Sequence, residues 1–154
     1  MKRRARKVGL FNPNAFFLSD LNLLLQIVLF VVLLVGFLLA KYKRSFRNHG
    51  VTMLAALVLH TILIFGVMLP SLLSLKAGLL ANLSSTLALS TIPHAILGTI
   101  VEVFAIYLVG TFLFNHGDVK SCFKNKRRMQ LTLILWFLEV ILGIYIYFLL
   151  YVPM

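Results

Sequence analysis

Residues 21–40 read LNLLLQIVLFVVLLVGFLLA, a run of 20 residues without one charged side chain. An α-helix rises about 1.5 Å per residue, so this run is about as long as the roughly 30 Å hydrocarbon core of a bilayer is thick. An uncharged apolar run of this length is typical of a transmembrane helix. The stretch therefore predicts that the chain crosses a membrane.

Three further apolar runs follow the first. The chain of 154 residues is 61% hydrophobic and only 12% charged, a composition typical of membrane proteins. The linkers are too short to hold a second domain. The sequence predicts an all-α fold, an integral membrane four-helix bundle that forms one domain over residues 1–154, with helices at about 21–40, 51–75, 95–115 and 131–151. We expect an ordered outer loop or a short interfacial helix between Lys76 and Pro93.

The basic residues predict the orientation of the helices. They collect in the first and third linkers, as Lys41, Lys43, Arg44, Arg47, Lys120, Lys124, Lys126, Arg127 and Arg128. Loops rich in Lys and Arg stay in the cytoplasm, so these two loops are predicted to be cytoplasmic and both termini outside the cell membrane. Five Lys and Arg residues between positions 2 and 7 favour the opposite side for the amino terminus. Topology and contacts with anionic lipids explain the net charge of +11, so we expect no nucleic-acid partner.

Three ionisable residues, His60, Glu102 and Glu139, lie near the middle of three separate apolar runs. A charge at the centre of a bilayer costs at least about 2.5 kcal/mol, so such residues are rare and usually functional. At about 100° of turn per residue, each falls on or beside a stripe of small and polar residues on its helix. Counting residues from the helix ends puts all three at one depth, which predicts a shared cluster inside the bundle.

Three interpretations of this cluster remain open. One imidazole and two carboxylates form a ligand set that suits a transition metal. The same groups could instead pass protons along the bundle as a relay. In the third interpretation, they only form hydrogen bonds that fix the register of the helices.

The other three histidines are candidate ligands for haem b or a metal. A membrane b-type haem needs two imidazoles at similar depth, with basic groups for its propionates. His49 and His116 meet this requirement at the cytoplasmic surface, where the propionates or lipid head groups could contact Arg44, Arg47 and Lys120. We expect His94 at the outer surface, about 17 Å from the depth of His60. The single cysteine, Cys122, excludes a paired-cysteine metal site.

A series of short motifs runs along most of the chain, from Leu18 to Tyr151. It consists of Leu21-Asn22, Gly36, the run from Arg47 to His49 with Met53, Pro93-His94, the basic Lys126 to Arg128, and Trp136 with Gly143 and Tyr145. The series resembles the YozB-like family, small four-span membrane proteins of unknown function that are often encoded near assembly factors for haem-copper oxidases. In that family, histidines recur at the positions of His49 and His94. The chain lacks the histidines that usually end the second helix and open the fourth.

The resemblance implies an accessory or assembly protein of a respiratory chain that binds haem b or a transition metal and contacts oxidase subunits. The midplane cluster instead favours a proton relay or proton-coupled carrier, which for four helices without an internal repeat would require a homo-oligomer. A purely structural subunit is the third alternative. The sequence holds no nucleophile motif or phosphate-binding loop, so an enzyme is the least supported class.

Overall fold

The computed structural model describes residues 17–114 and 125–151, and these residues form helices without any strand. The elements are α1 (Phe17–Lys41), α2 (Phe46–Leu63), the π-helical turn η1 (Ile64–Met68), α3 (Leu69–Ala81), α4 (Thr86–Phe114) and α6 (Lys126–Tyr151). In the described part of the chain, four helical stretches are long and apolar enough to cross a bilayer, with α2, η1 and α3 forming one of them. The prediction of an all-α, multi-pass membrane protein is confirmed.

The boundary between the second and third spans differs from the prediction. Helix α3 continues to Ala81, and α4 begins at Thr86 instead of residue 95, so only four residues remain of the predicted outer loop. Ser85 starts α4, because its hydroxyl accepts a hydrogen bond of 3.2 Å from the backbone N–H of Ala88. Side-chain oxygens at this position satisfy one of the unpaired N–H groups of a helix start. The apolar residues before the turn and the capping serine after it explain why both segments are helical.

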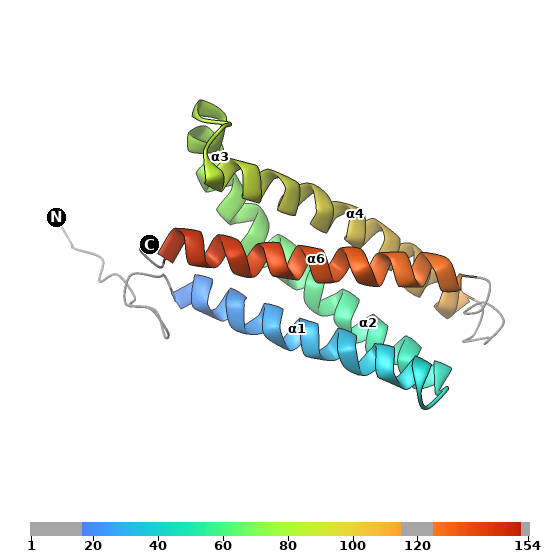
Figure 1. Ribbon diagram of the computed structural model, residues 1–154. Helices are drawn as coiled ribbons and strands as arrows, with labels where there is room; N and C mark the ends of the chain where they lie inside the picture. Colours follow the sequence, from blue (N-terminus) through green and yellow to red (C-terminus); the bar gives the residue numbers. More distant parts are fainter. Residues whose placement is uncertain (1–16, 115–124, 152–154) are drawn as a thin grey trace.

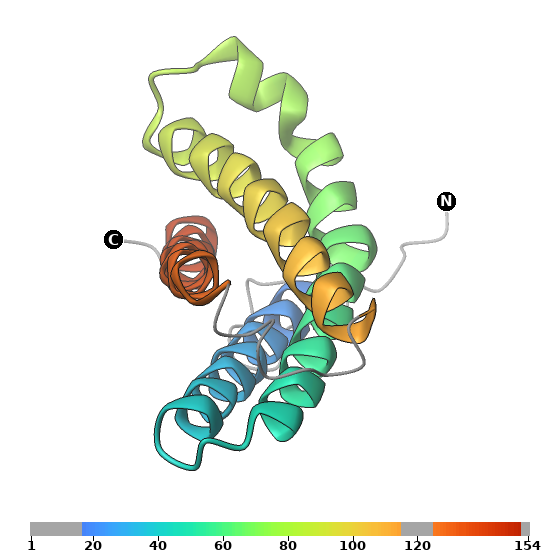
Figure 2. The same cartoon turned by 90° about the vertical axis from the view of Figure 1, so that its right-hand side faces the viewer.

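The spans pack as a ring in the order α1, α2, α4 and α6, so each helix contacts its neighbours in sequence and α6 closes the ring against α1. Figures 1 and 2 show α1 beside α2 and α4 beside α6 over much of their lengths. This up-and-down arrangement follows from short connections between antiparallel helices.

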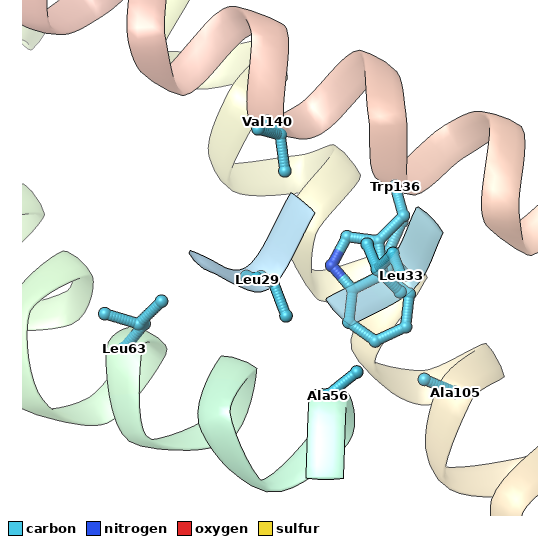
Figure 3. Close-up of a cluster of buried hydrophobic side chains, with 8 residues drawn as sticks. Leu29, Leu33, Ala56, Leu63, Ala105, Trp136 and Val140 are labelled. Carbon is cyan, nitrogen blue, oxygen red and sulfur yellow. The ribbon is translucent and has the colours of Figure 1, made fainter. Parts of the chain in front are cut away.

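All four spans contribute to the core in Figure 3. Its buried members are Leu29, Leu33, Ala56, Leu63, Val101, Ala105, Trp136 and Val140. Because lipid tails are as apolar as these side chains, their stabilising effect comes from close packing rather than from removal of water. Many other large apolar side chains on the spans are exposed, as expected of surfaces that face lipid.

The second span bends on its way through the bundle. Its 36 residues would measure about 54 Å as a straight helix, well beyond the thickness of the hydrocarbon core. The π-helical turn at Ile64–Met68 lies directly before Pro70, which has no backbone N–H to donate. Figure 2 shows the chain changing direction between α2 and α3, so that α3 lies away from α1 and α6.

Candidate functional site

The structure brings His60, Glu102 and Glu139 together in the interior of the bundle. His60 on α2 is completely buried, and its Nδ1 donates a hydrogen bond of 2.8 Å to Oε2 of Glu102 on α4. The other ring nitrogen, Nε2, lies 3.7 Å from Oε1 of Glu139 on α6. The imidazole is therefore placed between two carboxyl groups that come from two other helices.

His94 is a fourth member of this group, which corrects the expectation that it lies at the outer surface. Its Nδ1 donates a hydrogen bond of 3.1 Å to the backbone carbonyl of Glu139. Its Nε2 lies 3.7 Å from Oε1 of the same residue. The carboxyl group of Glu139 is thus shared by the Nε2 atoms of two histidines. We call Glu102, His60, Glu139 and His94 the buried relay cluster.

The register between α4 and α6 explains why Glu139 reaches His94. The depths predicted from the sequence were counted from His116 on the third span and from Arg128 on the fourth, as if these two residues lay at the same level. In the structure, Arg128 donates a hydrogen bond of 2.8 Å to the hydroxyl of Tyr107, about two turns before the end of α4. Helix α6 therefore begins nearer the middle of α4 than the sequence predicts. This brings Glu139 close to His94.

The hydrogen bond to a backbone carbonyl fixes which ring nitrogen of His94 carries a proton. Since a carbonyl oxygen only accepts, the Nδ1 of His94 carries a proton, and its Nε2 is the nitrogen that can gain or lose one. In the buried relay cluster, Nε2 of His60 and Oε1 of Glu139 have no hydrogen-bond partner among the described residues. Buried polar atoms are nearly always paired, so this nitrogen and oxygen, which face each other at 3.7 Å, distinguish the cluster from the apolar core around it.

Other polar groups adjoin the cluster. The hydroxyl of Thr61 donates to Oε1 of Glu102 at 2.5 Å, and the Trp136 ring lies 5.1 Å from the His60 ring, centroid to centroid. Sequence reasoning did not link either residue to the carboxylates. Thr61 follows His60 directly and therefore lies about 100° round the same helix, which is the one sequence signal for its role.

The polar groups continue towards the end of the bundle where α1 begins and α6 ends. The amide of Gln26 and the ring of His94 meet over Gly143, where a Cβ atom would lie 2.7 Å from Oε1 of Gln26 and 3.1 Å from Cε1 of His94. One turn further along α6, the hydroxyl of Tyr147 donates a hydrogen bond of 2.6 Å to the fully buried Asp20. The interior of the bundle is therefore polar from Glu102 to Asp20.

No group of three or more His, Cys, Asp or Glu side chains in residues 17–114 and 125–151 is arranged to hold a metal ion. The interpretation of the cluster as a transition-metal site therefore has no support from its geometry.

A cavity of about 860 Å³ lies near the end of the bundle that carries the first basic loop. Its apolar wall includes Met53, Leu108 and Phe112, and its basic residues are Lys41, Arg44 and Lys126. We call it the basic cavity. Trp136 lines it too and also packs against His60, so the cavity adjoins the buried relay cluster.

The predicted haem pair is described only in part. His49 lines the basic cavity, and its Nδ1 donates a hydrogen bond of 2.8 Å to the carbonyl of Gly36, which leaves Nε2 as the nitrogen that could bind iron. His116 and Lys120 lie outside the described residues. Arg44 lines the cavity as expected for a propionate or lipid contact, whereas Arg47 is exposed and is not part of its lining.

Comparison of the chain with protein-family models, curated proteins and solved structures finds no match. The resemblance to the YozB-like family therefore stays an expectation from short motifs. Any function has to be argued from the chain's own residues and their geometry.

Proposed function

We propose that this protein conducts protons within the membrane through the buried relay cluster. The observation that supports this proposal most directly is the position of Glu139, whose carboxyl oxygen lies 3.7 Å from Nε2 of both His60 and His94. Ionisable groups at this depth are costly and are typical of proton pathways. Four such groups in sequence form a path in which every transfer has a donor and an acceptor.

Each transfer can be assigned to named atoms. A proton taken up at Nε2 of His94 passes to Oε1 of Glu139, and from there to Nε2 of His60. His60 then loses the proton on Nδ1 to Oε2 of Glu102, along the hydrogen bond of 2.8 Å. Reorientation of the His60 side chain, so that its protonated nitrogen again faces Glu102 and its unprotonated nitrogen again faces Glu139, resets the path for the next proton. A small movement of the Glu139 side chain shortens its two contacts of 3.7 Å to hydrogen-bond length in turn.

The length and ends of this path are consistent with transport along the membrane normal. His94 and Glu102 are eight residues apart on α4, which corresponds to about 12 Å along the helix. Gln26 and the pair of Tyr147 and Asp20 extend the polar interior beyond His94. At the other end, the side chain of Glu102 is 12% exposed, which makes it the less buried of the two carboxyl groups.

Proton flux into proteoliposomes tests the proposal. Vesicles with purified protein are given a potassium diffusion potential with valinomycin, and acidification is followed with a trapped pH dye. We expect a flux above that of empty vesicles, and we expect Glu139→Gln and Glu102→Gln each to lower it by about tenfold or more, since an amide does not pass protons on. A flux equal to that of empty vesicles contradicts the proposal.

Ser90→Ala provides the matched control. Ser90 is buried on α4, as the cluster is, but its hydroxyl donates only to the backbone carbonyl of Thr86 at 2.8 Å. Its removal is expected to leave the flux unchanged. If Ser90→Ala lowers the flux as much as Glu139→Gln does, the loss reflects disturbed packing, and the cluster is not the path.

An accessory or assembly role in a respiratory chain, with haem bound, is a second candidate function. The observation that favours it is the free Nε2 of His49 beside the basic cavity, where Arg44 is close enough to hold a propionate. A bound haem would supply a redox centre there. A reduced-minus-oxidised absorption spectrum of the purified protein tests this candidate, and a Soret band that is lost in His49→Ala would support it.

For either function we propose the orientation that the basic loops favour, with the α1–α2 turn and the segment between α4 and α6 in the cytoplasm. The basic cavity would then open near the cytoplasmic leaflet, and Asp20 would lie near the outer one.

A further inference from the structure

The basic cavity combines apolar walls with positively charged side chains. Lys41, Arg44 and Lys126 are among its lining residues, and none of the described lining residues is an Asp or Glu. The volume of about 860 Å³ lies within the range of about 300–1,000 Å³ found for ligand sites. Three cations beside an apolar wall complement a molecule with an anionic head and an apolar tail.

The backbone of Arg44 provides an independent observation. Its φ of 49° lies in the left-handed region, and within the described residues no other residue except glycine has a positive φ. A side chain with a Cβ atom is strained in this conformation, whereas glycine is not. The turn is held by a hydrogen bond of 3.1 Å from the N–H of Ser45 to the carbonyl of Leu39. This left-handed turn at the end of α1 fixes the direction in which the chain leaves the helix at Arg44, beside the cavity.

Arg128 and Lys43 at this end of the bundle do not line the cavity. Arg128 is hydrogen-bonded to Tyr107 and lies over its ring, 5.6 Å from the centroid. Lys43 is exposed and is not part of the cavity lining. The positive charge of the cavity is therefore contributed by particular residues from the α1–α2 turn and the start of α6.

We propose that the basic cavity binds one anionic glycerophospholipid, with an acyl chain against Met53, Leu108 and Phe112 and the phosphate between Arg44 and Lys126. A lipid fits better than haem, because His49 is the one histidine among the described lining residues, whereas a membrane b-type haem takes two imidazoles. The inference does not rest on the proton relay, since its residues are not those of the buried relay cluster.

Native mass spectrometry of the purified full chain tests the proposal. The protein in detergent is titrated with palmitoyl-oleoyl phosphatidylglycerol and, separately, with phosphatidylcholine of the same chains. We expect one phosphatidylglycerol to bind at least about fivefold more tightly than phosphatidylcholine. Arg44→Gly and Lys126→Ala should each weaken phosphatidylglycerol binding by about fivefold, because each removes one cation from the site.

Two controls separate binding from folding. Arg44→Gly relieves the strained backbone, so its unfolding temperature should equal or exceed that of the wild type while its lipid affinity falls. Lys43→Ala removes an equal charge from the same turn outside the cavity, and it should leave lipid affinity unchanged.

Four outcomes would overturn the proposal. The first two are equal binding of the two lipids and equal effects of Arg44→Gly and Lys43→Ala on lipid affinity. The third is displacement of the lipid by glycerol 3-phosphate, which has no acyl chains. The fourth is a His49-dependent Soret band with added haemin that excludes the lipid. Proton flux that depends on Glu139 would be unaffected by any of them, so failure of this inference is distinguishable from failure of the proposed function.

Discussion

Gly143 has a larger role at the residue scale than its lack of a side chain suggests. Glycine is common where membrane helices approach one another, and packing alone explains most such positions. At Gly143, the missing Cβ leaves room for the amide of Gln26 and the ring of His94. The glycine therefore helps to place His94 beside Glu139.

We predict that Gly143→Ala destabilises the protein by about 1 kcal/mol, because the added methyl would crowd two buried polar side chains. Gly110 on α4 is the matched control, since a Cβ added there would meet no side chain or other helix within 4 Å. Gly110→Ala should instead stabilise by about 0.5 kcal/mol through the higher helix propensity of alanine. Unfolding in mixed micelles, followed by Trp136 fluorescence, measures both. Equal stabilisation by the two substitutions would contradict the role given to Gly143.

At the scale of the element, the second span is the one that departs most from a regular helix. The π-helical turn at Ile64–Met68 and Pro70 follow each other within one span. Sharp bends in helices usually occur at proline or at π-helical turns, and here both are present. The bend separates the part of the span that packs in the bundle from α3.

We predict that Pro70→Ala straightens the second span, because residue 70 regains a backbone N–H for the helix ladder. Spin labels at exposed Val51 and Leu80, introduced as Val51→Cys and Leu80→Cys with Cys122→Ser, measure the change by double electron-electron resonance. A straight helix would separate the two positions by about 43 Å. The wild type should give a shorter distance than Pro70→Ala, and equal distances would show that the proline does not cause the bend.

At the scale of the whole molecule, the two ends of the bundle differ chemically. One end carries the basic cavity and the α1–α2 turn, and the other carries the buried pair of Asp20 and Tyr147. The polar interior lies between them. Orientation in the membrane therefore decides from which side protons would enter.

The orientation proposed above predicts that Cys122 is accessible from the cytoplasm. A membrane-impermeant maleimide should label it in inverted vesicles and not in intact cells. In a Cys122→Ser variant, Lys76→Cys in α3 is the control for the opposite end, since Lys76 is exposed. It should be labelled in intact cells. The reverse pattern would place the basic loops outside and would agree with the basic amino terminus instead.

The fold class could be predicted from the sequence because it depends on local chemistry. Four apolar runs of bilayer length require helices, since a helix satisfies its own backbone hydrogen bonds in lipid. The inward position of His60 and Glu139 also follows from one local quantity, the turn of about 100° per residue. Between Lys76 and Pro93 the residues are only mildly apolar, and there the predicted helix boundary was wrong.

The relation between helices could not be predicted in the same way. Residue counting placed His94 far from His60, whereas the tertiary structure brings both to one carboxyl oxygen of Glu139. Register between two helices is set by contacts such as that of Arg128 with Tyr107, which no periodicity within a single helix contains. The sequence by itself determined that His60, Glu102 and Glu139 lie within apolar helices and on or beside their inward stripes. The tertiary structure decided which of them meet, because side-chain contacts fix how far one helix slides along another.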